Sequence, residues 1–288
     1  MYFPPTDPDF RLAAQIDKRV DDLVSRPSVQ LFAAAPDSVR KQGSIYVVDG
    51  PPIVGLGSGT LFRVGQYYFI ITAAHVVEEL CDNGREFRVA VGNPSRPQPL
   101  PITDENSVLD EDNDVAAILL KPEAAPHFVS ARFLGLDDIA FDDNIHDWWC
   151  VLHGCLWEGT QPGKDYSQLL VHNLKYWTKR YDGKVSAKSF DDARHILVEY
   201  ERTGFSVPDS MPSENPKSLG GISGASLWRL FTRQHVEDGW SERAAKVVAV
   251  ENVVYDERVI RCTRWRHVLP LLAKLRHEIE TALNHLGV

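Results

Sequence analysis

Apolar residues near both ends of the chain recur every three to four positions. In residues 8–25 the positions with this spacing are Phe10, Ala13, Ile16, Val20 and Leu23. Residues 264–286 repeat the pattern at Val268, Leu271, Leu272, Leu275, Ile279 and Leu283. This period predicts two amphipathic helices, each with one apolar face that must pack against the rest of the protein or against a partner.

Between these helices, short β-branched and aromatic runs are bounded by Gly, Pro, Asn and Asp. A first region contains SIYVVDG, GTLFRVG, YYFIITAA, FRVAVGN and DVAAILLK. A second contains WWCVLHGCLW, SQLLVHNLKYWTKR, KVSAKSF, HILVEYER, ASLWRLF and KVVAVENVVY. Loop-like segments at 122–126 and 137–144 separate the regions, and Asp182-Gly183 is a hairpin turn signal. The pattern predicts an all-β protein, and periodicity alone allows paired antiparallel barrels or a sandwich equally.

Composition excludes several function classes. The 31 basic and 40 acidic residues give a formal net charge of -9, which argues against a nucleic-acid partner, because phosphate backbones are bound by clustered Lys and Arg. The apolar runs are strand-length, so no membrane span is predicted. The first residues contain neither a cationic region nor an apolar run, so we expect no secretory signal and a cytoplasmic location.

The four cysteines are few and irregularly spaced. Cys81, Cys150, Cys155 and Cys262 are therefore interpreted as free thiols in a reducing compartment. A zinc site remains an alternative, since four soft ligands fall within ten residues: His146, Cys150, His153 and Cys155. Neighbouring ligands on one strand point to opposite faces, so we expect no metal and no cofactor.

Three short motifs carry candidate chemistry. Ile70-Ile71-Thr72-Ala73-Ala74-His75 runs an apolar strand into a histidine; Asp112-Asn113-Asp114 directly precedes another apolar strand; and Gly220-Gly221-Ile222-Ser223-Gly224 is a Gly-rich bend around a serine. Taken singly, these motifs are also typical of a core histidine, a strand-entry aspartate and an ordinary turn. Taken together, they supply a nucleophile, a base and a group that orients the base.

The order His75, Asp114, Ser223 and the motifs T-A-A-H, D-[apolar]-A and G-x-S-G resemble the trypsin-like (chymotrypsin-fold) serine peptidases, in a bacterial-type form. Gly57-Ser58-Gly59 strengthens the resemblance, because a similar strand precedes the histidine in many bacterial members. A dinucleotide-binding loop and a lipase-type nucleophile elbow are both excluded by the glycine spacing. The resemblance implies two packed antiparallel six-stranded β-barrels with an N-terminal helical extension and a C-terminal helix.

The resemblance also implies roles for single residues. Ser223 is expected to be the nucleophile, His75 the general base and Asp114 the residue that orients the histidine. The backbone N–H groups of Gly221 and Ser223 are expected to form the oxyanion hole. The implied activity is that of a serine endopeptidase that works through an acyl-enzyme.

The substrate-binding strand of the family corresponds to residues 247–254. Val250, Glu251 and Asn252 are the expected substrate-binding residues on it. Glu251 favours a basic side chain before the scissile bond, whereas Lys217 stands where a trypsin-type enzyme carries its specificity aspartate. Because these cues oppose each other, the sequence predicts a protein or peptide substrate with no defined residue preference.

The resemblance begins near residue 43 and divides the chain. We expect residues 1–40 to be a helical extension outside the catalytic unit, available to a regulatory protein partner. Residues 41–288 are expected to be the peptidase domain, with a first barrel at 41–125, a second at 145–262 and the helix at 264–286. Two other functions stay open: a catalytically silent trypsin-like module that binds proteins, and a plain β-sandwich interaction domain.

Overall fold

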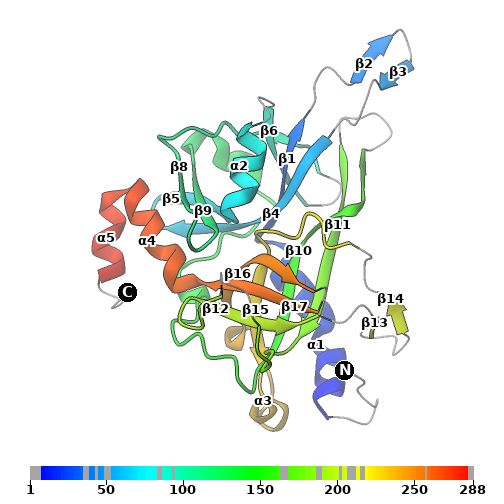
Figure 1. Ribbon diagram of the computed structural model, residues 1–288, viewed down its shortest axis with the longest axis vertical. Helices are drawn as coiled ribbons and strands as arrows, with labels where there is room; N and C mark the ends of the chain where they lie inside the picture. Colours follow the sequence, from blue (N-terminus) through cyan, green and yellow to red (C-terminus); the bar gives the residue numbers. More distant parts are fainter. Residues whose placement is uncertain are drawn as a thin grey trace.

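The computed structural model describes most of the chain and shows a mostly β protein (Figure 1). The described residues are 8–34, 39–42, 45–48, 53–82, 86–92, 95–162, 168–185, 190–200, 203–205, 212–214, 218–256 and 258–284. Among them, no helix is long and apolar enough to cross a membrane.

The first sheet is antiparallel and has seven strands in the order β7-β6-β1-β4-β5-β9-β8. Its strands are β1 (Ser28–Ala34), β4 (Ile53–Val64), β5 (Tyr67–Thr72), β6 (Glu86–Val91), β7 (Gln98–Pro99), β8 (Ser107–Asp110) and β9 (Val115–Leu120). Helix α2 (Ala74–Asp82) follows β5. The sheet contains one strand more than the six expected.

The second sheet is antiparallel and has six strands in the order β11-β10-β15-β16-β17-β12. Its strands are β10 (Trp149–Pro162), β11 (Leu169–Thr178), β12 (His195–Glu199), β15 (Ser226–Phe231), β16 (Lys246–Tyr255) and β17 (Val259–Arg264). Two small hairpins pair β2 (Val39–Gln42) with β3 (Ile45–Val48) and β13 (Thr203–Phe205) with β14 (Pro212–Glu214). The predicted all-β class with two antiparallel halves is confirmed.

Helices lie around the sheets. They are α1 (Pro8–Ser25), α3 (Arg233–Asp238), α4 (Trp265–Leu275) and α5 (His277–Asn284), with short 3-10 helices at Pro122–Phe128, Leu136–Asp138 and Glu242–Ala244. In Figure 1 the first sheet lies above the second, α1 lies beside the second sheet, and α4 and α5 flank the junction of the two sheets.

The predicted N-terminal helix is present as α1. Its apolar face packs into the largest core cluster of the described residues, where Ile16 and Val20 join Trp228 and Phe231 of β15. Hydrogen bonds also connect the helix to the second sheet, because both Lys175 and Trp177 of β11 donate to the carboxylate of Asp17. The helix therefore rests on the second sheet.

The first sheet contains a strand from the segment that the sequence analysis assigned to the extension. Strand β1 pairs with β4 on one side and β6 on the other, so it is an interior strand. Strand pairing of this sheet thus begins at Ser28, upstream of residue 41. Division of the chain into separate domains stays a prediction.

The prediction of one C-terminal helix over 264–286 is wrong. The segment forms two helices, because Arg276 at the end of α4 has an extended backbone (φ −146°, ψ 106°). Both helices nevertheless bury their apolar stripe in the same core cluster, including Leu272 of α4 and Leu283 of α5. Because of the bend at Arg276, the apolar faces of α4 and α5 both pack against the same core cluster.

Other local expectations had mixed outcomes. The candidate strand KVSAKSF (184–190) lies largely outside the described residues, and with it the strand after Asp182-Gly183. Strand β17 and helix α2 were not predicted. The Val76-Val77 pair that extended the apolar run of β5 in sequence lies in α2 and packs into the core of the first sheet.

Candidate active site

His75 and Asp114 form a direct pair at one end of the first sheet. Nδ1 of His75 lies 2.9 Å from Oδ1 and 3.1 Å from Oδ2 of Asp114, and the backbone N–H of His75 donates to the same Oδ1 at 3.2 Å. His75 stands in the first turn of α2, and Asp114 stands just before β9, which pairs with β5. Adjacent strands of one sheet therefore bring the two motifs together.

This pairing fixes the ring of His75. An ionised carboxylate only accepts hydrogen bonds, so Nδ1 carries the proton and Nε2 presents a lone pair. The hydrogen bond to Asp114 raises the pKa of His75, and burial opposes the rise. The histidine side chain is 42% exposed, so solvent reaches part of the ring.

Asp114 adopts a left-handed backbone conformation, with φ +51°. The second sheet holds this turn in place. The amide of Asn252 donates to the carbonyl oxygens of Asn113 and Asp114, at 3.1 and 3.3 Å, and the Thr263 hydroxyl donates to the Asn113 carbonyl at 2.6 Å. The turn that carries the aspartate is thus fixed by both sheets.

Ser223 lies in a tight turn that precedes β15. The turn is closed by hydrogen bonds from the N–H of Ile222 to Leu219 O and from the N–H of Ala225 to Ile222 O. The carbonyl of Ser223 is hydrogen-bonded to the first sheet, since the N–H of Ser58 on β4 donates to Ser223 O at 2.7 Å. Ser58 also donates through its hydroxyl to the carbonyl of Gly221 at 2.8 Å. One serine of β4 therefore holds two carbonyls of the turn.

Glycines at 221 and 224 are required by this geometry. Both have positive φ, +93° and +92°. A Cβ on Gly224 would overlap the carbonyl of Ser58 and the hydroxyl of Thr72, and one on Gly221 would lie 2.9 Å from the backbone nitrogen of Trp157. Thr72 lies on the strand that leads to His75, so the serine turn packs directly against the strand that carries the histidine motif.

Two backbone N–H groups of the turn are unengaged. In the part of the chain that the structure describes, neither Gly221 nor Ser223 donates its N–H to a protein acceptor, whereas Ile222 and Gly224 both do. The N–H of Gly224 bonds to Glu251 O at 2.8 Å. The two free donors are those of the expected oxyanion hole, which remains a prediction.

The third contact of a triad is not made in this structure. Within the described ranges, the hydroxyl of Ser223 has no hydrogen bond to His75. Catalytic hydrogen bonds in substrate-free enzymes are often long and tighten when substrate binds. The structure therefore brings His75 and Asp114 together and places Ser223 in the adjoining turn.

The expected substrate-binding residues lie on β16 beside this turn. Val250 pairs with Ser226, and the N–H and C=O of Glu251 bond to Ala225 O and Gly224 N. All three side chains are buried. The Asn252 amide is engaged with the Asp114 turn, and its Oδ1 accepts from Arg261 at 3.0 Å. Their contact with substrate stays a prediction, and Lys217 lies outside the described residues.

Glu251 is an unusual member of this group. Its side chain has no exposed surface, and neither carboxyl oxygen has a hydrogen-bond partner in the part of the chain that the structure describes. Burial raises its pKa to about 8.

The cysteines and histidines of the zinc alternative do not assemble. Among the described residues, no three His, Cys, Asp or Glu side chains lie close enough to hold a metal ion. None of the four cysteines forms a disulfide among the described residues, and Cys81 is exposed whereas the other three are buried. Burial raises the pKa of Cys150 and of Cys155 to about 12, which suits neutral core thiols.

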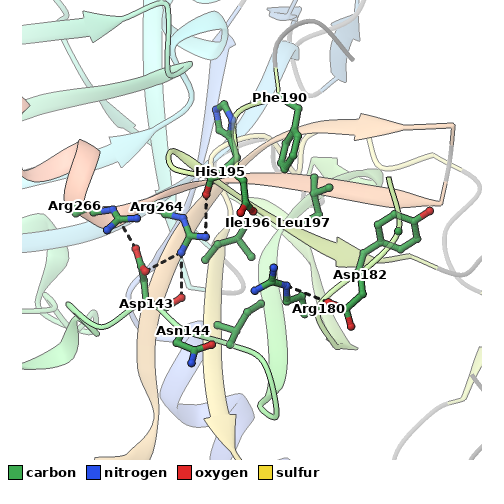
Figure 2. A pocket seen from close by; sticks show the side chains of 14 residues that line it. Asp143, Asn144, Arg180, Asp182, Phe190, His195, Ile196, Leu197, Arg264 and Arg266 are labelled. Carbon is green, nitrogen blue, oxygen red and sulfur yellow. Dashed lines mark hydrogen bonds and ion pairs between the residues drawn. The ribbon is translucent and has the colours of Figure 1, made fainter. Parts of the chain in front are cut away.

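A separate cavity of about 370 Å³ lies in the second half of the molecule (Figure 2). Arg264 reaches Asp143 Oδ1 at 2.7 Å, Arg266 reaches the other oxygen at 3.4 Å, and Arg180 pairs with Asp182. None of the expected catalytic residues lines it. The arginines that line the cavity are paired with aspartates of the lining. We therefore interpret these ion pairs as contacts that hold chain segments together.

Sequence reasoning missed the residues that join the two halves of the site. Ser58 donates to the carbonyl of Gly221 in the serine turn, and Thr263 donates to the carbonyl of Asn113 in the aspartate turn. Thr72 donates to the carbonyl of Ser58 itself. Thr72 and Ser58 stood within motifs that were recognised, but their roles depend on a turn far away in sequence. Asn252 was assigned to substrate; in the structure its amide also holds the aspartate turn, a role that the sequence did not indicate.

Comparisons with known proteins gave structural neighbours only. No family model and no curated protein matches the sequence. One similar structure is the active form of the Rv3671c protease from M. tuberculosis, at 16% identity and a TM-score of 0.45, covering 91% of this chain and 86% of that one. Another is the inactivated protease paralogue S-I1 of the scabies mite, at 13% identity and 0.49, covering 88% and 96%.

Proposed function

We propose that this protein is a serine endopeptidase that hydrolyses peptide bonds through an acyl-enzyme, with Ser223, His75 and Asp114 as its catalytic triad. The observation that carries the proposal is the bond of His75 Nδ1 to both oxygens of Asp114. It leaves Nε2 of His75 as a free base, and the turn that contains Ser223 packs at Gly224 against Thr72, on the strand that leads to His75.

Each chemical step has a candidate group. His75 Nε2 takes the proton of the Ser223 hydroxyl as Oγ attacks the substrate carbonyl, and Asp114 balances the imidazolium that forms. The N–H groups of Gly221 and Ser223 receive the negative oxygen. His75 then gives its proton to the leaving amine, and a water molecule, activated by the same base, releases the acid from Ser223.

The proposed substrate is a protein or peptide whose backbone adds to β16 beside the serine turn. A narrow regulatory substrate in the cytoplasm, with a protein partner that binds near α1, belongs to the same proposal. The support for a peptide substrate is the chemistry of the site.

A fluorophosphonate probe tests the nucleophile directly. The serine oxygen displaces fluoride from phosphorus, so only an activated hydroxyl becomes labelled. We expect the full chain to be labelled at Ser223, as located by mass spectrometry of its peptides, and Ser223→Ala to remain unlabelled. Ser218→Ala removes an exposed serine five residues away and should label like the wild type.

The competing function is a silent module that keeps the fold and binds proteins. The missing hydrogen bond between Ser223 and His75 is the observation in its favour. A folded wild-type protein that resists labelling from pH 6 to 10, also with candidate partners added, would establish that alternative.

A further inference from the structure

Glu251 has a carboxyl group without a role in the proposed mechanism. It nevertheless neighbours the serine turn and interacts with His75 and Asp114. Its backbone bonds on both sides to the serine turn, at Gly224 N and Ala225 O, each at 2.8 Å. Its side chain interacts electrostatically with His75, Asp114 and Arg261. The serine turn and the histidine–aspartate pair therefore share this residue as a neighbour.

The environment of the carboxyl decides its charge. An ionised carboxylate without hydrogen bonds is very unfavourable in the protein interior, because nothing replaces its hydration. The side chain is fully buried, and both oxygens lack a hydrogen-bond partner among the described residues. At neutral pH, Glu251 is therefore a neutral acid.

The charged and titratable groups that face it come from four elements. His75 lies on α2, Asp114 lies before β9, and Arg261 and Cys262 lie on β17, where Cys262 is the register partner of Glu251. Cys150 of β10 lies near Cys262, and burial raises the pKa of the Cys262 thiol well above its ordinary value. Arg261 is only 3.7 Å from Asp114 Oδ2, so its charge is shared with the catalytic carboxylate. Of these groups, His75 is the proposed general base, and a negative charge on Glu251 raises its pKa.

We propose that Glu251 is a positioning residue that tunes the basicity of His75: neutral in the resting enzyme, it leaves His75 free to act as a base, and ionised at alkaline pH it makes that base stronger. This inference rests on the proposed function, since it concerns the same histidine. It assigns to Glu251 an electrostatic role through His75 in place of direct contact with substrate.

The proposal predicts that the labelling rates of the wild type and of Glu251→Gln differ at alkaline pH and agree below neutral pH. A negative Glu251 favours the imidazolium, so it raises the pKa of His75 and, in a general-base step, the limiting rate. In Glu251→Gln, which keeps the shape and cannot ionise, labelling should match the wild type near pH 6, where the wild-type Glu251 is also neutral. Near pH 9.5, where the wild-type carboxylate is ionised, the variant should be labelled more slowly.

Glu79→Gln is the matched control. Glu79 also acts on the charge of His75, but it is exposed and therefore screened by water and salt. Its labelling profile should follow the wild type. A purely structural role of Glu251 would instead scale the labelling rate by one factor at every pH, and profiles that keep a constant ratio would overturn the proposal.

A second measurement does not need catalysis. In the Ser223→Ala protein, the His75 ring should show two inflections by NMR, one for its own titration and one near pH 8 for Glu251. A single inflection refutes the coupling even if Glu251→Gln fails to fold. Absence of labelling in the wild type refutes the proposed function, whereas a single inflection refutes only this inference.

Discussion

The backbone N–H of Ser58 donates to the carbonyl oxygen of Ser223 at 2.7 Å, and this bond joins a strand of the first sheet to the candidate nucleophile of the second half. The serine turn is therefore held from outside its own sheet. Its position depends on how closely the two backbones approach, and glycine makes that approach possible.

Gly224→Ala should disrupt this junction. The new methyl group would overlap Ser58 O, a backbone atom that cannot move aside, and φ is +92° at this position. We expect a lower melting temperature and a loss of fluorophosphonate labelling. Gly220→Ala is the control, since its Cβ would meet only the Ser218 hydroxyl, at 3.3 Å. Equal behaviour of the two variants would contradict the packing argument.

Asp114→Asn should fold and lose activity. Asparagine tolerates the left-handed conformation that Asp114 adopts, so the turn can form. The amide can donate to Nδ1, which stabilises the wrong tautomer of His75 and should lower the rate about 10⁴-fold. His75→Ala should be comparably inactive. Kinetic assays on a peptide ester, with circular dichroism to verify folding, would measure this. A rate within tenfold of wild type would remove Asp114 from the triad.

Helix α1 should contribute to the free energy of unfolding of the whole fold. Val20 is fully buried in the core cluster that also contains β15 and α4, whereas Gln15 on the same helix is exposed. Val20→Asp places an unpaired carboxyl in that core and should lower the free energy of unfolding by several kcal/mol. Gln15→Asp should have little effect. Deletion of residues 1–26 should likewise destabilise the domain; a truncated protein with unchanged melting temperature would support the separate extension expected from the sequence.

His153 should make the fold sensitive to acid. Ser28 donates its hydroxyl to Val24 O, so it accepts from His153 Nδ1, 2.7 Å away. Burial lowers the pKa of His153 from 6.5 to about 3. The unfolded chain then binds more protons than the native protein between these values, so this residue makes stability fall as the pH is lowered from 6.5 toward 3.

Melting temperatures measured across that pH range test this expectation. His153→Gln removes the titrating group and should reduce the slope. His277→Gln alters a histidine whose side chain is 92% exposed and should leave the slope unchanged. Identical slopes in all three proteins would contradict the assignment.

Activity should not require cleavage to a new N-terminus. In digestive members of the trypsin-like family that the sequence resembles, an aspartate stands just before the serine and pairs with a newly released amino group. Here Ile222 occupies that position and is buried in an apolar cluster. A buried ammonium without a partner is strongly unfavourable. The protein with intact Met1 should be labelled directly or once a partner is added, as checked by intact mass, and labelling only after a cut upstream of Gly43 would disprove this.

The sequence alone determined the periodic elements and the local chemistry. The stripe of α1, most of the core strands and the three motifs at His75, Asp114 and Ser223 could be read from it, because apolar period and turn chemistry act over neighbouring residues. It also showed, through Ile222, that a charge required by one activation scheme is missing. These features need no knowledge of distant contacts.

Tertiary structure decided what depends on long-range packing. The apolar run of β1 looked like part of an extension, and only its pairing with β4 and β6 makes it an interior strand. The C-terminal stripe is continuous in sequence, yet it bends at Arg276 so that both helices reach one core. Glu251 was expected to bind substrate from its strand; its full burial follows from the packing of β16 against the serine turn. Burial and proximity arise between segments far apart in the chain, so no local pattern encodes them.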